Sequence, residues 1–441
     1  MLTTETIVSA ALDLTWVRSQ FPALAQTVSG YPAAFLDGPG GTQVPQRVID
    51  AISNYLRRDN ANTCGAYATS RHTDAMLAEA RAAMADFLNC ADDEIVFGQN
   101  MTSLTFAMSR AIGRDLGPGD EILVARLDHD ANVSPWLALG EKGVTIRWAE
   151  IHEEDCTLDL DDLARKINDR TKLVAVGYAS NAVGTINLVK KIVSLAHAAG
   201  ALAYVDAVHY GPHGLIDVAA LDCDFLACST YKFFGPHMGV LFGKREHLAR
   251  LHPYKVRPLT DAVPNRWEWG TLNHECIAGI TACVDYIADL GTKHGGTDAL
   301  VRPSSEARSL STSSRRAAIV AAFEAIHNYE HQLMRRLMTG LAQIPNIKIY
   351  GITDPARFSE RCPTLAVRVR NQTADQTPLA LSTKLGDQGF FTWDGNYYAL
   401  NLTERLDVEK TGGFLRIGLV HYNTAEEVDR FLAALKHIVA F

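Results

Sequence analysis

The feature that most restricts the fold is a series of short, wholly apolar runs between residues 72 and 245. These runs do not alternate between apolar and polar positions, so each predicted strand is covered on both faces, as in parallel sheets that lie between helices. Amphipathic helices are predicted among them, at 74–88 and 188–199. The pattern predicts an α/β fold built on a sheet with crossover helices. The predicted strands are 94–97, 121–125, 172–178, 202–205, 225–228 and 239–243.

A second, smaller α+β region is predicted toward the C-terminus. The stretch 291–314 is rich in Gly, Ser and Thr and predicts an exposed insertion at a domain joint. Beyond it we predict a long helix at 316–342, strands at 347–350 and 364–369, and helices at 377–387 and 424–438. The expected domains are an N-terminal segment, 1–30, that packs with the small domain, a large domain at 31–290, an insertion at 291–315 and a small domain at 316–441.

Charge and hydropathy exclude several classes of protein. The chain has 441 residues with 42 basic and 50 acidic side chains, a net charge of −8, which offers no electrostatic footprint for nucleic acid or an anionic membrane. The longest uncharged stretch, 173–189, is interrupted by glycine, serine and asparagine, so no membrane span is predicted. Glu5 and Asp13 stand where a signal peptide would carry cations, so we expect a cytoplasmic protein.

The eight cysteines form no C-x-x-C pair and no Cys/His cluster at zinc spacing along the sequence. We therefore expect reduced cysteines that mostly pack in the core, and no metal site.

Lys232 lies between two predicted core strands, in the string STYKFFGPHMG. Most lysines extend to solvent, and that is the plain structural interpretation of this one. However, hydroxyl groups come directly before it and a Gly-Pro turn follows, an arrangement suited to holding an amine beside a phosphate in a cleft. A lysine whose pKa is lowered by burial is the residue that forms Schiff bases. We predict that Lys232 has this role.

Asp206 follows the predicted strand 202–205, at the carboxyl end where open parallel sheets place their ligands. Taken alone, this aspartate is better interpreted as a helix cap. Beside a Schiff-base lysine, a carboxylate has a specific task, because it keeps a pyridine nitrogen protonated so that the ring can accept electrons.

Two further sites follow predicted strands. Met101, Thr102 and Ser103 begin a predicted helix, where backbone N–H groups and hydroxyls form a phosphate cradle, although simple capping by Thr102 is the alternative. His129 follows strand 121–125, where an imidazole can lie on a ring and relay protons, although a lone histidine is more often structural.

Along the chain these residues come in the order phosphate turn, His129, Asn181, Asp206, Lys232. This order resembles that of fold-type I pyridoxal-phosphate enzymes, and more narrowly of the class V aminotransferase group that includes the cysteine desulfurases. The resemblance covers nearly the whole chain. It implies a large domain with a mostly parallel seven-stranded sheet and a smaller α+β C-terminal domain. The further segments that carry it are YPAAFLDGPGGTQVP, ASNAVGT, VDAVHYGPH, RWEWGTLN and LRIGLVHYNTAEEVD.

The resemblance also implies roles for individual residues. Lys232 would hold the pyridoxal phosphate, Asp206 would pair with its pyridine nitrogen and His129 would stack on its ring. A small amino acid would be the substrate, and the enzyme would be a homodimer with shared active sites. The phosphate would be held by Met101, Thr102, His209, Thr230 and, from the neighbouring subunit, Thr271, and the substrate carboxylate by Asn181 and Arg416.

The chain departs from the desulfurase pattern at two places. His209 stands where desulfurases usually have glutamine; it can still donate to the ring oxygen, but it can also titrate. The segment GFFTWDGNYYAL, aligned with the loop that carries the desulfurase nucleophile, contains no cysteine. Cys362 is interpreted as a packing residue, and Cys64 is not expected to be a nucleophile.

The leading hypothesis is therefore a pyridoxal-phosphate enzyme of the desulfurase-like branch that lacks the persulfide cysteine. An aminotransferase and an amino-acid lyase or epimerase are the enzyme alternatives, and Trp393 and Tyr397 would form walls of the substrate pocket or belong to the small-domain core. The non-enzyme alternative is a degenerate interaction scaffold. The presence together of Lys232, Asp206 and Arg416 argues against it.

Overall fold

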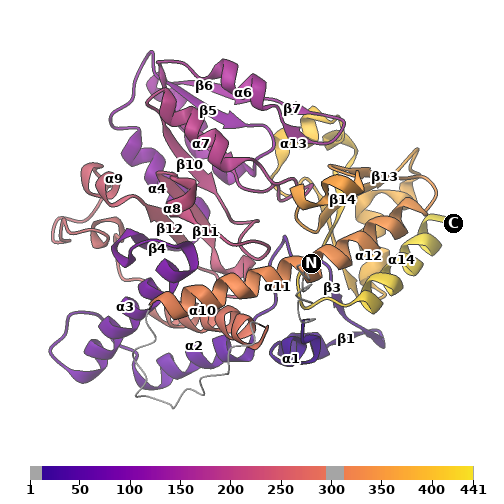
Figure 1. Cartoon of the computed structure of the whole chain (residues 1–441), viewed down its shortest axis with the longest axis horizontal. Helices are drawn as coiled ribbons and strands as arrows, with labels where there is room; N and C mark the ends of the chain where they lie inside the picture. The colour runs from indigo at the N-terminus through magenta and orange to yellow at the C-terminus, as the bar shows by residue number, and fades with distance from the viewer. Residues whose placement is uncertain (1–11, 295–311, 441) are drawn as a thin grey trace, which may run out of the picture.

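A computed structural model describes residues 12–294 and 312–440 (Figure 1). Its largest sheet has seven strands in the order β4-β12-β11-β10-β9-β5-β6. Four of the six pairings are parallel, and β12 is antiparallel to both of its neighbours. The strands are β4 (Ile95–Gly98), β5 (Glu121–Ala125), β6 (Thr145–Ala149), β9 (Thr171–Gly177), β10 (Leu202–Asp206), β11 (Phe225–Ser229) and β12 (Gly239–Gly243).

The six strands predicted from continuous apolar runs are confirmed, each to within a residue or two. The seventh, β6, was not predicted. It is an edge strand that pairs only with β5 among the described residues, and its side chains are exposed at Thr145 and partly exposed at Arg147. An edge strand needs no continuous apolar run, so it lacks the signal that identified the other six.

Both faces of the large sheet are buried. Successive residues of β5, Ile122 and Leu123, belong to two different apolar clusters, one on each face. Helices α3 and α7 contribute to the first cluster and α4 to the second. The helices of this part are α1 (Leu14–Ser19), α2 (Gln46–Arg58), α3 (Ala68–Leu88), α4 (Met101–Ile112), α5 (Ser134–Leu137), α6 (Leu160–Lys166), α7 (Val189–Ala198), α8 (Val218–Leu221), α9 (Arg245–Arg250) and α10 (His274–His294).

A separate antiparallel sheet of four strands forms the right side of Figure 1, in the order β13-β14-β17-β16. It has its own apolar cluster, which includes Leu365 and Leu415. Its strands are β13 (Ile347–Tyr350), β14 (Thr364–Val369), β16 (Trp393–Gly395) and β17 (Phe414–Gly418). The accompanying helices are α11 (Thr312–Ala342), α12 (Pro378–Gly386), α13 (Leu400–Arg405) and α14 (Ala425–Ala440), and the three long helices predicted here are confirmed.

Helix α10 continues to His294 and α11 begins at Thr312, so most of the predicted 291–314 insertion lies at 295–311, outside the described residues.

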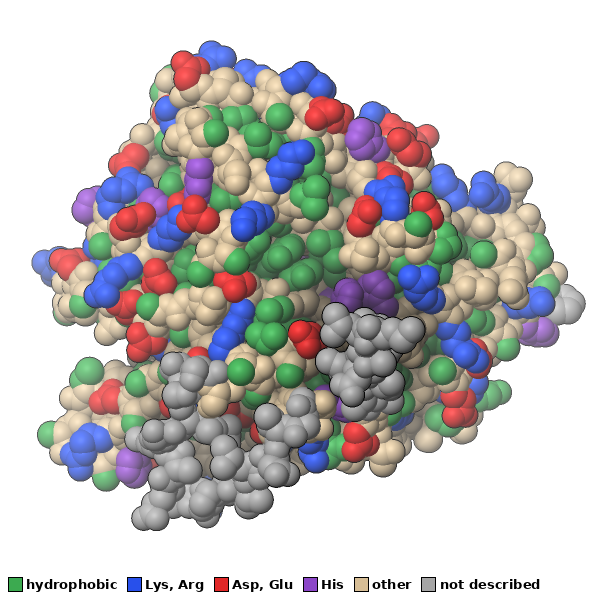
Figure 2. Space-filling view, viewed as in Figure 1, with side chains coloured by type: hydrophobic (Ala, Val, Ile, Leu, Met, Phe, Trp, Pro, Cys, Tyr) green, Lys and Arg blue, Asp and Glu red, His purple; other side chains and the backbone are tan. Residues whose placement is uncertain are grey.

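The N-terminal helix α1 contacts α14 through an ion pair, in which the Arg18 guanidinium lies 2.9 Å from the Glu427 carboxylate. Among the described residues, no helix is long and apolar enough to cross a bilayer. Acidic and basic side chains are interspersed over the face drawn in Figure 2.

Candidate active site

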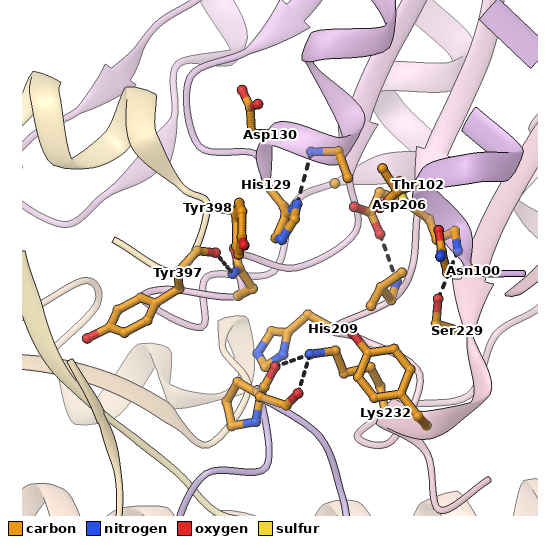
Figure 3. A pocket seen from close by; sticks show the side chains of 18 of the residues that line it. Asn100, Thr102, His129, Asp130, Asp206, His209, Ser229, Lys232, Tyr397 and Tyr398 are labelled. Carbon is orange, nitrogen blue, oxygen red and sulfur yellow. Dashed lines mark hydrogen bonds between the residues drawn. The ribbon is translucent and has the colours of Figure 1, made fainter. Parts of the chain in front are cut away.

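A cavity of about 1140 Å³ lies between the carboxyl ends of β5 and β10 and the residues of β16 and β17 (Figure 3). The sheet topology explains its place, since ligands bind at the carboxyl ends of parallel strands. Two predicted site residues, Thr230 and Thr271, do not line it. Eight do: Met101, Thr102, His129, Asn181, Asp206, His209, Lys232 and Arg416.

Lys232 ends a single 3₁₀ turn that follows β11, and its Nζ points into the cavity. Nζ donates hydrogen bonds to the carbonyl of Gly40, at 2.9 Å, and to that of Pro39. Burial, together with the Arg416 charge, lowers the pKa of Lys232 to about 7. Half of the amine is therefore neutral near pH 7, which is the form that attacks a carbonyl.

Asp206 is the last residue of β10 and is almost fully buried. The backbone N–H of Val208 donates to its carboxylate at 2.9 Å, so a local capping contact does exist. Burial raises the pKa of Asp206 to about 6, and the nearby Lys232 charge opposes this rise. A carboxylate held in this way is strongly stabilised by a cationic partner inside the cavity.

His129 follows β5, and its Nδ1 accepts a hydrogen bond from the N–H of Ala131 at 3.0 Å. This contact places the remaining hydrogen of a neutral ring on Nε2. Burial, reinforced by the charges of Lys232 and Arg416, lowers the pKa of His129 to about 4. The imidazole is therefore neutral at pH 7. Its ring stacks on Tyr398, with centroids 5.4 Å apart.

The amino end of α4 borders the cavity beside these groups. Asn100, not Thr102, is the cap residue, and its side chain accepts a hydrogen bond from the N–H of Ser103 at 2.8 Å. The N–H of Met101 donates to the Ser229 hydroxyl at 3.0 Å, which ties the helix start to the end of β11. The Thr102 side chain is free of a capping role and is exposed.

Arg416 extends from β17 into the cavity and is buried. One of its nitrogens donates to the Asn181 carbonyl at 2.9 Å, and its guanidinium lies 4.1 Å from the centre of the Tyr397 ring. The Asn181 amide in turn donates to the Tyr397 carbonyl at 2.8 Å. The two residues predicted to bind a carboxylate are thus adjacent.

The segment 393–398 closes the cavity from the small-sheet side. Tyr397 and Tyr398 have φ angles of 55° and 61°, in the left-handed region that is unfavourable for aromatic residues. The carbonyl of Tyr398 accepts a hydrogen bond from the N–H of Asp130 at 2.7 Å. Tyr397 is buried, whereas the side chain of Tyr398 is 68% exposed. Both aromatic residues predicted as walls, Trp393 and Tyr397, do line the cavity.

The last three residues predicted to contact the cofactor, His209, Thr230 and Thr271, differ in burial and in whether they line the cavity. His209 is 4% exposed, and its Nε2 has no hydrogen-bond partner among the described residues. The Thr230 hydroxyl donates to the carbonyl of Pro236 and is fully buried, away from the cavity. Thr271 is exposed.

Sequence reasoning missed two carboxylates near the site, Asp128, which is buried, and Asp37, which is half-buried. Asp128 lines the cavity next to His129 and accepts hydrogen bonds from the Asn132 side chain and from the N–H of Gly177, both at 2.8 Å. Burial raises its pKa to about 8. Burial likewise raises the pKa of Asp37 to about 6, against the charges of Arg416 and Lys232. Each had a signal in the sequence: Asp128 directly precedes His129, and Asp37 lies in YPAAFLDGPGGTQVP, one of the segments that carry the family resemblance.

All eight cysteines are among the described residues, and none of them lines this cavity. Cys64 is exposed in the loop between α2 and α3. Cys362 is buried, as expected for a packing residue, but its sulfur lies beside His209 and His213.

Comparison with known proteins agrees with this geometry. The family model described as Aminotransferase class-V matches residues 34–297 and 316–431. The chain is 31% identical to a probable cysteine desulfurase from Synechocystis, covering 96% of this chain and 95% of the relative. It is 30% identical to an aminotransferase-like protein from Gibberella zeae, covering 98% and 100%.

Two solved structures show the same fold. A cysteine desulfurase from Escherichia coli aligns with a TM-score of 0.80 and 24% identity, over 98% of this chain and 99% of the other. The apo cysteine desulfurase from Thermococcus onnurineus aligns with a TM-score of 0.79 and 24% identity, over 95% and 98%.

Proposed function

The chain belongs to the aminotransferase class-V family, and on this premise we propose that it acts on a small amino acid through a desulfurase-like site that uses no persulfide-forming cysteine. It is a pyridoxal-phosphate-dependent enzyme with the fold-type I architecture. The observation that carries the proposal is the convergence of Lys232, Asp206 and Arg416 on one cavity that no cysteine lines.

The residues present fit the cofactor. A buried carboxylate, Asp206, and an amine of lowered pKa, Lys232, face one cavity and lack a direct hydrogen bond to each other. The amino end of α4 lies at the same cavity, where backbone N–H groups favour a phosphate. A side chain at Gly239 would collide with Asn100, because an added Cβ would lie 2.4 Å from its backbone, so glycine is required for this close packing of helix start and strand.

When bound, the cofactor supplies an electron sink that makes bonds to the substrate α-carbon labile. In the proposed arrangement Lys232 would hold the cofactor, and its Nζ would carry the proton that moves to or from the substrate. Asp206 keeps a proton on the ring nitrogen, and neutral His129 covers the ring. The start of α4, at Met101 and Thr102, holds the phosphate.

Substrate orientation is assigned to Arg416 and Asn181. A guanidinium binds a carboxylate through a planar, two-pronged contact, and Tyr397 holds this one in place from 4.1 Å. Because Arg416 is buried, its charge needs an anionic partner, and the substrate carboxylate provides one.

Sulfur transfer by the desulfurase route is not expected. That route needs a thiolate that reaches the substrate sulfur and then leaves carrying it. The segment 393–398 offers Asp394, Asn396 and Tyr397, none of which accepts a sulfur atom. Burial raises the pKa of the Cys362 thiol, so this sulfur is not a nucleophile at neutral pH.

We also propose an oligomeric state, domain boundaries and a cellular location for the protein. We propose a homodimer in which Thr271 from the neighbouring subunit completes the phosphate contacts. Thr230, predicted to share this role, takes no part in it, because its buried hydroxyl donates to the Pro236 carbonyl outside the cavity. We also propose the division into an N-terminal segment at 1–30, a large domain at 31–290, an insertion at 291–315 and a small domain at 316–441, and a cytoplasmic location.

The proposal is tested by mixing the purified protein with a panel of amino acids while the visible spectrum of the cofactor is followed. We expect some small amino acids to shift the band. Product analysis then separates the classes, since an aminotransferase needs a keto-acid acceptor whereas a lyase or epimerase does not. A protein that binds the cofactor but responds to no amino acid would be the degenerate scaffold.

A second experiment tests the absence of a persulfide. The protein is incubated with cysteine, without added reductant, and all eight cysteines are examined by mass spectrometry. We expect no persulfide. Catalytic formation of alanine with a persulfide on Cys64 or Cys362 would contradict the proposal, and release of sulfide with pyruvate would identify a lyase.

A further inference from the structure

A second, smaller cavity of about 140 Å³ lies outside the candidate active site. Five of its lining residues can ligate a metal or position a ligand: His213, His327, His331, Glu330 and Cys362. They come from the turn after β10, from α11 and from the residue pair just before β14. These residues are close in space but far apart in the chain. Their spacing along the sequence therefore did not indicate a metal site.

Three ligand atoms converge beside this cavity. One nitrogen each of His209 and His213 and the sulfur of Cys362 lie within 4.8 Å of one another. In a tetrahedral zinc site, with bonds of about 2.0 to 2.3 Å, such atoms are about 3.3 to 3.7 Å apart. Two ligand atoms at the 4.8 Å limit therefore need to approach each other by about 1.1 to 1.5 Å to surround an ion, which side-chain rotation can supply.

The histidines present free nitrogens while buried. His209 and His213 are each 4% exposed, and the Nε2 of each has no hydrogen-bond partner among the described residues. Leaving a buried polar atom without a partner costs free energy, so such an atom in a folded protein calls for a ligand or an ordered water. Here two of them lie beside a buried thiol.

The surroundings supply the second layer that metal sites require. The carboxylate of Glu330 lies 2.7 Å from Nδ1 of His213, which orients the ring and leaves its Nε2 free. A carboxylate behind a metal-bound histidine is the usual arrangement around zinc. The charges of a divalent ion, the Cys362 thiolate and the Glu330 carboxylate balance one another, and the buried Arg361 guanidinium adds one positive charge beside Cys362.

An access path is also present. His327 and His331 lie on successive turns of α11, with ring centroids 4.1 Å apart, and both line the second cavity. His327 is exposed. Figure 2 shows histidine side chains gathered near the middle of one face of the molecule, where α11 runs in Figure 1. Imidazoles thus lead from the surface toward the buried ligands.

We propose that His209, His213 and Cys362 bind one zinc ion, with Glu330 as the outer carboxylate. Three protein ligands leave a fourth position for water from the second cavity. Binding releases the Cys362 proton, since the metal takes the thiolate. The ion joins the turn after β10 to the residues before β14, and so fixes His209 in the wall of the candidate active site.

This placement has a consequence for His209. With its Nε2 on the metal, the ring carries its hydrogen on Nδ1 and can only donate there. His209 stands where the desulfurase pattern has glutamine, which is also a donor. The zinc proposal itself depends on the cluster geometry and not on the proposed function.

The first test measures metal in the untagged holoenzyme after dialysis against micromolar zinc, by inductively coupled plasma mass spectrometry. We expect about one zinc per chain that resists a weak chelator. Cobalt substitution gives an independent readout, because thiolate-bound tetrahedral Co²⁺ absorbs in the red, away from the cofactor band. No bound zinc, or cobalt without these bands, would overturn the proposal.

Variants assign the ligands. His213→Ala and Cys362→Ser should each weaken zinc binding about a hundredfold or more, and Glu330→Gln about ten- to a hundredfold. His209→Gln should lose zinc and keep the cofactor. The control is Cys283→Ser, which changes an equally buried thiol that lies outside both cavities and donates to the Phe233 carbonyl at 2.9 Å. Zinc retained in both His213→Ala and Cys362→Ser, or lost equally in Cys283→Ser, would overturn the assignment.

If a variant does not fold, anomalous scattering at the zinc edge from crystals of the unmodified protein shows whether zinc lies between His209, His213 and Cys362. An anomalous peak elsewhere, or none, would overturn the proposal.

Discussion

The two sides of the candidate active site differ in how closely they follow the family. On the large-sheet side the strand-end group, His129, Asp206 and Lys232, occupies the positions that the family pattern predicts. On the small-sheet side the segment 393–398 carries aromatic and amide side chains in place of a cysteine loop. Under the proposed function, the large-sheet side activates the amino acid and the small-sheet side sets the step that follows.

The largest effect is expected at the centre of the strand-end group. Lys232→Ala removes the only described lysine lining the cavity, and activity should fall about 10⁴-fold or more because the covalent attachment is lost. Borohydride reduction and peptide mapping of the unmodified protein should place the pyridoxyl label on Lys232. Lys244→Ala, at a surface ion pair, serves as the control. A label on another lysine would overturn the site assignment.

Asp206→Asn is expected to be the next most harmful change. An ion pair at contact distance in a medium of effective dielectric ~20 contributes roughly 4 kcal/mol, which corresponds to about a thousandfold in rate. We expect kcat to fall accordingly while the cofactor remains bound, as measured by absorbance after gel filtration. Wild-type kcat in this variant would show that the ring nitrogen has no partner here.

Arg416→Lys probes the junction of the two sides. Lysine cannot reproduce the two-pronged contact, so KM for the amino acid should rise about ten- to a hundredfold while cofactor retention stays unchanged. Arg368→Lys, at a buried arginine of β14 that contacts the Thr411 and Gly413 carbonyls, is the matched control. If Arg416→Lys releases the cofactor instead, then Arg416 has a structural or phosphate role.

The pH dependence of cofactor rebinding tests the environment of Lys232. Its pKa is lowered to about 7, so the reactive neutral amine increases as pH rises through 7 and is nearly complete above 8. The rate at which apoprotein rebinds cofactor should therefore rise about tenfold from pH 6 to pH 8 and then level off. A rate that continues to rise tenfold per unit up to pH 10 would mean that the amine has an ordinary lysine pKa.

The smallest effect is expected on the small-sheet side. Tyr398→Ala removes a ring that stacks on His129 but is largely exposed, so KM should change by about threefold and the cofactor spectrum very little. Tyr254→Ala, at an exposed tyrosine outside the cavity, is the control. A loss of kcat in Tyr398→Ala as large as that expected for Asp206→Asn would show that the small-sheet side is as important for catalysis as the large-sheet side.

Much of the fold was accessible from the sequence because buried strands and long amphipathic helices leave continuous patterns. The six buried strands of the large sheet followed from apolar runs, whereas β6 did not, since an edge strand exposes polar side chains. Asn100 as the cap of α4 was missed, because capping depends on the local backbone conformation, and Thr102 offered an equally suitable side chain.

The sequence by itself determined the strand ends and the chemistry placed on them, since Asp206 follows an apolar run directly, and His129 and Lys232 each come four residues after one. Only the tertiary structure decided which distant segments meet. In the folded chain the Tyr397 ring contacts Arg416, and the Tyr398 ring stacks on His129. Likewise, Cys362 lies beside His209 and His213. Local patterns encode what one segment does alone, whereas such meetings depend on the packing of two sheets against each other, which no short stretch of sequence specifies.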